Sequence, residues 1–473
     1  MPPVDSFSSS TNTPPFPLLL VRQRDLPDAD ATRRRLAAAL LGYLAALVLL
    51  LTLAPFQFVR PDSPRVLLLG PAFDQAMNVL LFVPLGFLYL QTRRAGGRGG
   101  VLHALGAGAL VSLGIETVQL FEPERYSSVS DVLANTLGAG LGASLQVRLS
   151  ARLRLDAARV RRLALELPLM GLVYLLVPLL WLNAVGVAGS AWALPQLLLL
   201  GLFGGSLLAA VQREHFGRVG LVTPRGMALA SGGWFLLGAF PALALRPLAV
   251  SAAALTVVGY VGVRARYAGG PAGAERRFEA DALRRAAPFF AAYLLLLAVL
   301  PPEPLSAEWV VHWGLPGHSG ASKLAMIRLL EAVAAFTLLG YLLAELRGRR
   351  ELPYAAVAGP VALRAAGAVL LVEGLRAFQP GYGASMLGAA LLLGAALYGA
   401  ALYHLQRAHV RWLVMQEQTR RELAAEERLP ALVGWARGGG AAVGAPHQRH
   451  STPSTGSSGS APMGRGKASS SAR

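Results

Sequence analysis

The sequence predicts an all-α fold, a polytopic transmembrane helical bundle, on three observations. Of the 473 residues, 54% are hydrophobic and only 15% are charged, whereas a soluble domain carries about a quarter charged residues. Apolar runs such as residues 36–56 reach the length of about 20 residues that crosses a bilayer. These runs are apolar on every side, without the alternation that a barrel strand needs, and only helices and closed barrels satisfy their backbones in lipid.

About twelve spans are expected, in three groups of four. The first group comprises residues 36–56, 72–91, 101–121 and 131–148. The second comprises 163–186, 191–211, 226–245 and 247–264, and the third 286–302, 324–346, 353–376 and 384–405. The corresponding domains are a four-helix domain over 36–150, a central four-helix membrane region over 151–285, and a third region over 286–410.

Arginine placement predicts the orientation. Arginines cluster after every even-numbered span, as at Arg93–Arg94, Arg148 and Arg347, while the odd-numbered loops hold few. Basic residues favour the cytoplasmic side, so both termini are expected in the cytoplasm, as tails over 1–35 and 411–473. The second tail is Ser/Gly-rich and expected to be largely disordered. The same rule explains the net charge of +18 without a nucleic-acid partner.

A polar cluster interrupts the first group of spans. Three spans place polar residues at the outward membrane level: Asp74, Asn78, Glu116, Gln119, Asp131 and Asn135, with Arg125 in the loop above them. Residues three or four apart share one helix face, and ionisable groups near lipid normally face a bundle interior or a water-filled cavity. The pattern predicts a polar pocket that opens outward.

A structural interpretation stays open beside it. Ser130 or Asp131 could cap the fourth span, and Arg125 could pair with Glu116 or Asp131 to hold the loop. Gly138 follows in a G-x-x-x-G pattern, which favours a close helix contact within the bundle.

The third region resembles the first. The segment "IETVQLFEP" at 115–123 aligns with "VEGLRAFQP" at 372–380, so the two regions look like parallel repeats. In the second copy, Tyr382 or Gly383 stands where Arg125 is expected, and no Asp or Asn begins the last span. Opposite charges, Arg328 with Glu331 and Glu373 with Arg376, can neutralise each other there. We interpret this copy as a degenerate partner that contributes packing; a second ligand site is the alternative.

Other chemistry has little support. There is no cysteine, and His312 and His318 lack the further ligands that a metal needs. No metal site and no cofactor are expected, and the oligomeric state is open.

The residues and their order resemble the VanZ-like family. The carrying motifs are "NVLLFVPLGF" from Asn78, "IETVQLF" from Ile115, Arg125, and "DVLANTLGAGLG" from Asp131, within about 36–148. The resemblance implies that Asn78, Glu116, Gln119, Arg125, Asp131 and Asn135 are characteristic polar positions. It also implies a bacterial inner-membrane location and a possible link to resistance against the glycopeptide teicoplanin or to envelope biogenesis.

Three functions follow as hypotheses. The first is a non-enzymatic protein whose pocket binds a lipid-linked glycan, a peptidoglycan fragment or a glycopeptide, in contact with membrane lipids. The second is a membrane-embedded hydrolase or transferase with Glu116 and Asp131 as general acid and base, although no established catalytic motif is present. The third is a transporter with parallel halves.

Overall fold

The computed structural model describes most of the chain between residues 29 and 438. The described residues are 29–54, 56, 58–60, 65–93, 98–123, 126–152, 157–187, 193–211, 223–267, 278–300, 306–314, 323–347, 353–379 and 383–438. The N-terminal tail and the last 35 residues lie outside them, as do Arg125, His318 and Tyr382.

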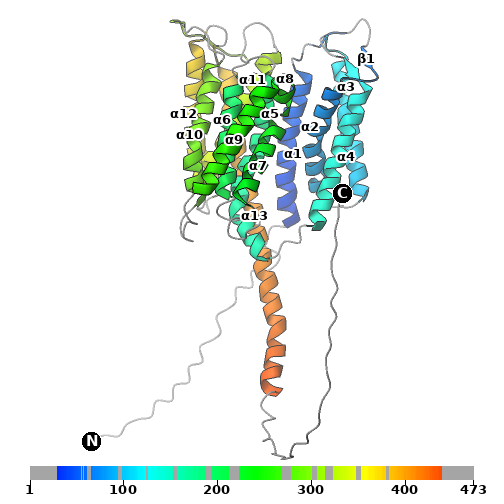
Figure 1. Cartoon of the computed structure of the whole chain (residues 1–473), viewed down its shortest axis with the longest axis vertical. Coiled ribbons are helices and arrows are strands. Elements are labelled where there is room, and N and C mark those ends of the chain that lie inside the picture. The colour runs from blue at the N-terminus through cyan, green and yellow to red at the C-terminus, as the bar shows by residue number, and fades with distance from the viewer. Residues whose placement is uncertain are drawn as a thin grey trace, which may run out of the picture. The chain divides into compact units, whose positions relative to one another are not determined.

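The described chain is a bundle of helices (Figure 1). In chain order they are α1 (Ala29–Leu53), α2 (Ala72–Thr92), α3 (Arg98–Gln119), α4 (Val129–Arg152), α5 (Ala157–Gly186), α6 (Ala193–Val211), α7 (Pro224–Gly238), α8 (Phe240–Leu245), α9 (Pro247–Tyr267), α10 (Phe278–Val299), α11 (Lys323–Arg347), α12 (Tyr354–Ala377) and α13 (Met386–Gly438). The all-α polytopic bundle is therefore confirmed.

Nine helices within the described residues are long and apolar enough to cross a membrane, namely α1, α2, α3, α6, α9, α10, α11, α12 and the first part of α13. The protein is thus a multi-pass membrane protein. The expected seventh span is divided: α7 ends at Gly238 and α8 begins at Phe240. Pro241 explains the break, because a proline has no N–H to continue the helical hydrogen bonds.

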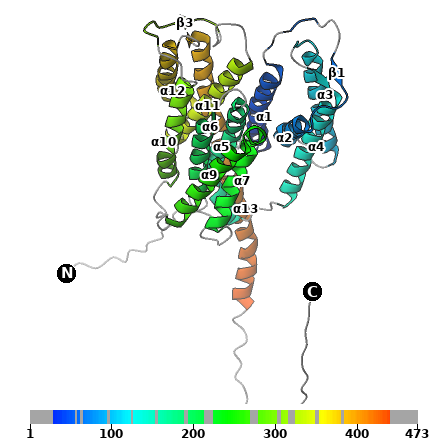
Figure 2. The same ribbon diagram turned by 45° about the horizontal axis from the view of Figure 1, so that its top comes forward.

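Two short parallel strand pairs lie at one end of the bundle (Figure 2). Strand β1 (Val66–Leu67) lies between α1 and α2 in the chain, and β2 (Ser127–Ser128) lies between α3 and α4. The two strands pair with each other in parallel. Strand β3 (Val311–His312) pairs with β4 (Ala384–Ser385) in the same position relative to α10–α13. We call this end of the bundle the strand end.

Close helix contacts build both of these regions. A Cβ on Gly142 of α4 would lie 1.9 Å from the Val83 carbonyl oxygen of α2, and one on Gly138 would lie 2.4 Å from that of Val79. Only glycine allows this approach, which confirms the predicted G-x-x-x-G contact. Helices α11 and α13 meet in the same way, since a Cβ on Gly399 would lie 1.8 Å from the Thr337 carbonyl oxygen.

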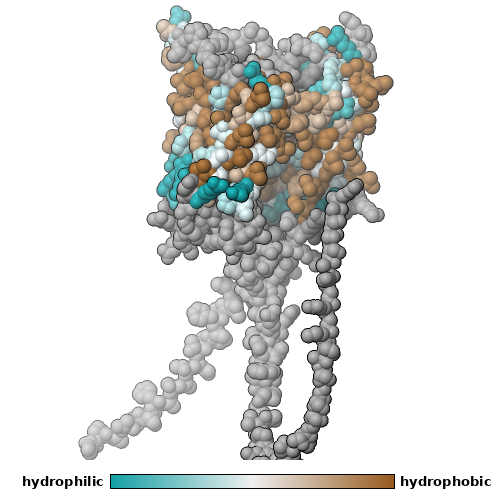
Figure 3. Space-filling model, viewed as in Figure 1, coloured by the Kyte–Doolittle hydropathy of each residue, from teal (hydrophilic) through white to brown (hydrophobic). Residues whose placement is uncertain are grey.

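The apolar core centres on α5, α6, α10 and α11. Phe203 of α6 packs against Phe290 of α10 with ring centroids 5.2 Å apart, and both side chains are buried. Helix α11 is the most buried of the nine candidate spans in the described residues. The lipid-facing surface shown in Figure 3 is largely hydrophobic, as a bilayer requires.

Helix α13 continues to Gly438, past the span expected to end at residue 405. Its extension is rich in Arg, Glu, Leu and Ala, which are strong helix formers. The chain divides into two compact units, Met1–Glu417 and Gln418–Arg473. Helices α1–α12 and both strand pairs belong to the first unit.

Candidate functional site

Two of the predicted polar residues hold loops at the strand end through backbone contacts. Glu116 is buried, and its Oε2 accepts a hydrogen bond of 2.7 Å from the backbone N–H of Ser128 in β2. Gln119 is also buried, and its Nε2 donates to the Thr52 carbonyl oxygen of α1 at 2.8 Å. These contacts fix the loop before α4 and tie α3 to the end of α1.

A third carboxylate, which sequence reasoning passed over, completes this set of loop contacts. Glu122 is buried, and its Oε1 accepts from the N–H of Phe56 at 3.0 Å. Phe56 has a φ of 64°, an uncommon conformation for a bulky residue. The hydrogen bond therefore stabilises a strained turn after α1. In the sequence, nothing beyond the acidic residue at position 122 indicates this contact.

The four remaining described residues of the predicted set lie on α2 and α4, which pack against each other. They are Asp74, Asn78, Asp131 and Asn135, and we call them the α2–α4 polar face. Asp131 is the meeting point of this face, since its carboxyl group lies beside Asp74, Asn78, Ser128 and Ser130. Asp74 is exposed, Asn78 and Asp131 are half-buried, and Asn135 is 4% exposed.

Serine residues connect this face to the strands. The Oγ atoms of Ser128 and Ser130 lie 2.8 Å apart, and Ser130 Oγ accepts from the Gly70 N–H at 2.9 Å. Ser128 therefore stands between Glu116, which its N–H contacts, and Asp131, which its hydroxyl approaches. Glu116 and Asp131, the two carboxylates considered from sequence as an acid and a base, therefore both lie next to Ser128. The Arg125 prediction lies outside the described residues.

Two buried oxygen atoms of the polar face have no donor among the described residues. They are Oδ1 of Asp131 and Oδ1 of Asn135. The Asn135 Nδ2 contacts the Ser112 hydroxyl at 2.8 Å, and either orientation of the amide leaves one of its two polar atoms without a partner. Buried polar groups in proteins are nearly always paired, so two such atoms one helical turn apart indicate a place where a ligand or water completes the bonding.

The third region repeats the loop contacts with other residues. Glu373 Oε2 accepts from the Ser385 N–H at 2.9 Å, as Glu116 does from Ser128. Arg376 donates to the Leu297 carbonyl oxygen of α10 at 3.4 Å, in the way that Gln119 contacts α1. Arg376 also forms an ion pair of 3.0 Å with Glu373, which confirms the predicted neutralisation.

The polar face itself has no counterpart in the third region. The register that aligns Glu116 with Glu373 places Gly388 opposite Asp131, Leu392 opposite Asn135 and Val369 opposite Ser112. The same region keeps the helix contacts and the loop contacts, so these do not require the polar face. Asp74, Asn78, Asp131 and Asn135 are therefore the part of the predicted set that packing alone does not explain.

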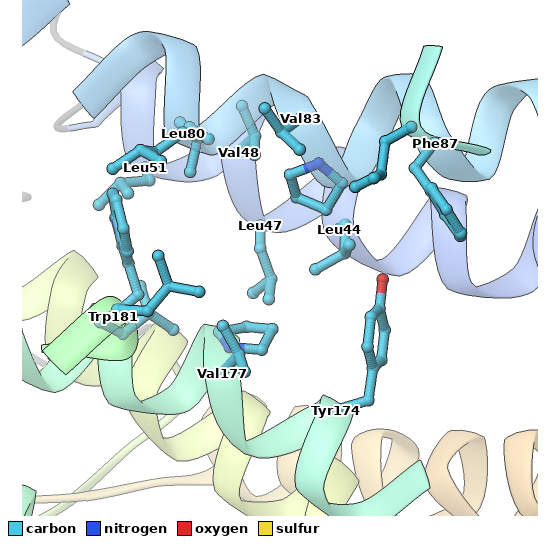
Figure 4. A pocket seen from close by; sticks show the side chains of 16 residues that line it. Leu44, Leu47, Val48, Leu51, Leu80, Val83, Phe87, Tyr174, Val177 and Trp181 are labelled. Carbon is cyan, nitrogen blue, oxygen red and sulfur yellow. The ribbon is translucent and has the colours of Figure 1, made fainter. Parts of the chain in front are cut away.

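A separate apolar cleft lies between α1, α2 and α5 (Figure 4). Its volume is about 380 Å³, and its walls include Leu47 and Val48 of α1, Phe87 of α2, and Tyr174 and Trp181 of α5. The lining is almost entirely hydrocarbon, so its chemistry matches that of lipid acyl chains. It contributes no polar group to the α2–α4 polar face.

Among the described residues, no three or more His, Cys, Asp or Glu side chains form a group that could hold a metal ion.

These features define a class: a multi-pass helical membrane protein with a polar face at the strand end of its first four helices. Residues 30–152, which take in α2–α4 and nearly all of α1, match the family described as VanZ/LLP1. The match includes every member of the polar face and confirms the resemblance seen in the sequence. No curated protein and no solved structure matches the chain.

Proposed function

We propose that the α2–α4 polar face binds the polar head group of a cell-envelope component that carries hydroxyl or amide donors. Lipid-linked glycans, peptidoglycan fragments and glycopeptides have this chemistry. One observation supports the proposal most directly: Oδ1 of Asp131 is buried at this face without a donor. A carboxylate accepts hydrogen bonds and donates none, so its missing partner must be a donor.

The arrangement of the face supports the same proposal. Asp74 is exposed and Asn135 is buried, with Asn78 and Asp131 at intermediate exposure between them. A ligand that enters at Asp74 would meet side chains with hydrogen-bond acceptors, and the burial of these side chains increases toward Asn135. Glu116 and Gln119 are engaged by backbone groups, so in this proposal they hold the loop that carries Ser128 and do not contact the ligand.

The predicted topology places the strand end outside the cytoplasmic membrane of a bacterium, where envelope precursors and glycopeptides occur. Arg125 lies two residues before the start of β2 in the chain, and in this proposal it contacts a phosphate or carboxylate of the ligand. The protein would then contribute to envelope biogenesis or to glycopeptide resistance by holding this head group.

The second candidate is a membrane-embedded hydrolase or transferase with Glu116 and Asp131 as acid and base. The observation in its favour is that both carboxylates lie against Ser128. Turnover of a lipid-linked precursor by the purified protein would favour this candidate over simple binding.

A binding titration tests the proposal. The full chain in lipid nanodiscs is titrated with a lipid-linked peptidoglycan precursor and, separately, with teicoplanin. The test variant is Ser112→Val/Asn135→Leu, which installs the apolar pair of the third region and removes both partners of the Ser112–Asn135 hydrogen bond together. Because replacing both partners by apolar groups is nearly neutral for stability, this variant should fold normally.

We expect the wild-type chain to bind at least one of the two probes, and the double variant to bind it about tenfold more weakly or worse. Asp131→Asn should weaken binding comparably. The matched control is Thr117→Val, since the exposed Thr117 hydroxyl donates to the Leu113 carbonyl oxygen of its own helix. Equal affinities of the wild-type chain and the double variant for both probes would contradict the proposal.

A further inference from the structure

A small crevice at the strand end of the third region lies between α10, α11 and α12. It is lined by Leu297, Leu300, Arg328, Leu329, Arg376 and Gln379, with small alanines beside them. Its free volume is about 20 Å³, enough for one water molecule or for the oxygen atoms at the edge of a larger group. Two arginines therefore line one small space.

Arg328 lines this space and has two unpaired donor atoms among the described residues. The side chain is 8% exposed, and its Nη1 donates to Gln196 Oε1 and to Glu331 Oε2, each at 3.1 Å. Its Nε and Nη2 are buried and have no acceptor among the described residues. Nε and Nη2 are the two donors that together form the fork which binds both oxygens of a carboxylate or phosphate.

Each arginine of the crevice is paired with a glutamate on its own helix. Arg376 is held by Glu373 through Nη1 at 3.0 Å, as Arg328 is held by Glu331. Neither glutamate is among the described residues that line the crevice. Glu331 is fully buried and lies against Gly186 of α5. The two carboxylates neutralise the arginines, and of the two guanidinium groups it is Arg328 that keeps nitrogen atoms without an acceptor among the described residues.

An unpaired buried guanidinium edge is costly, because charged donors lose more than neutral ones when they leave water without a partner. A single water molecule supplies one acceptor, whereas an oxyanion supplies two in the spacing of the fork. We propose that this crevice is an oxyanion site, with Arg328 as the bidentate ligand-binding residue and Arg376 as the second cation, which takes a phosphate or carboxylate group.

The alignment of the two regions makes this site the chemical opposite of the α2–α4 polar face. Gly86 and Gly340 make matching contacts, with Ala139 and Ala396 respectively, and this register places Arg328 opposite Asp74. The first region thus offers acceptors where the third offers donors. The sequence favoured a packing role for the third region, with a second ligand site as the alternative, and this inference adopts that alternative.

Anion-dependent stabilisation of the full chain tests the site. The protein is reconstituted in phosphatidylcholine nanodiscs, and its thermal midpoint is followed against inorganic phosphate or acetate, with sodium chloride at matched ionic strength as the reference. A further arm uses nanodiscs that contain phosphatidylglycerol. A shift with inorganic phosphate or acetate identifies a free anion, and a shift with phosphatidylglycerol alone identifies a lipid head group; either supports the proposal.

The variants separate recognition from folding. Arg328→Gln/Glu331→Gln removes both charges together and so avoids an uncompensated buried glutamate. Its apparent affinity for the effective probe should fall about tenfold or more. Arg328→Lys keeps the charge but loses the fork, and should also bind more weakly. The matched control Arg364→Gln, at an exposed arginine of α12, should bind normally.

The proposal is overturned if none of the three probes stabilises the wild-type chain more than the Arg328→Gln/Glu331→Gln variant. It is also overturned if Arg328→Lys binds as the wild type does, since the fork would then be irrelevant. The Ser112→Val/Asn135→Leu variant should keep the anion response, so this result is independent of the α2–α4 polar face.

Discussion

The backbone N–H of Ser128 donates a 2.7 Å hydrogen bond to Oε2 of Glu116, twelve residues earlier in the chain. The same relationship, at 2.9 Å, joins Ser385 to Glu373. In both regions a buried carboxylate near the end of one helix holds the strand that begins the next. A packing role therefore accounts for Glu116, and the binding proposal depends on the α2–α4 polar face instead.

Removing the Glu116 carboxylate should destabilise the protein, because a buried N–H would lose its charged acceptor. Glu116→Ala should lower the free energy of unfolding by about 1.5–3 kcal/mol, whereas Glu116→Gln keeps a carbonyl acceptor and should lose less. Unfolding in detergent, followed by circular dichroism, measures both, with Thr117→Ala as the exposed neighbouring control. Equal stability of Glu116→Ala and the control would show that the contact contributes nothing.

The contact between α2 and α4 should tolerate no side chain at Gly142. Its added methyl group would lie 1.9 Å from the Val83 carbonyl oxygen, and Gly142→Ala should therefore cost about 1–3 kcal/mol through overpacking. Gly106→Ala is the matched control on α3, where nothing lies within 4 Å of the new methyl group. Thermal midpoints of the two variants should differ in this direction. A midpoint for Gly142→Ala at or above that of the control would mean that the helices are not in this close contact.

Ser130 should hold the segment after β1 in place. Its hydroxyl accepts from the Gly70 N–H at 2.9 Å, so Ser130→Ala should cost about 1 kcal/mol and release this segment locally. Hydrogen exchange should become faster at Gly70 and remain unchanged in α6, which is remote in the core. Unchanged exchange at Gly70 would show that another contact fixes the segment.

The helices were predictable because their signals are local. Apolar runs placed α2 within a residue of its observed ends, and the spacing of Gly138 and Gly142 predicted a close contact. The i,i+3 spacing likewise predicted the Arg328–Glu331 ion pair, found at 3.1 Å. Each of these depends on residues within one or two helical turns.

The tertiary contacts of the site were not predictable in the same way. Val66 pairs with Ser127, and the Glu122 carboxylate accepts from the Phe56 N–H, although about sixty residues that include α2 and α3 separate the partners in the chain. Contacts at such separations leave no periodic signal in the sequence. Ser112 was missed as well, since a lone serine in an apolar helix usually bonds to its own backbone. Its contact with Asn135 exists because α3 and α4 pack side by side.

Side-selective cysteine labelling at Asp74 tests most directly whether the α2–α4 polar face receives a ligand from outside. The chain has no cysteine of its own, so Asp74→Cys and Thr223→Cys each give a single label site. Phe73 stacks on Phe240 beyond the end of α7, whereas Thr223 precedes its start, so the two sites lie at opposite ends of the bundle. A membrane-impermeant maleimide should label Asp74→Cys in intact cells and Thr223→Cys only after permeabilisation. Labelling of Asp74→Cys only after permeabilisation would contradict the account.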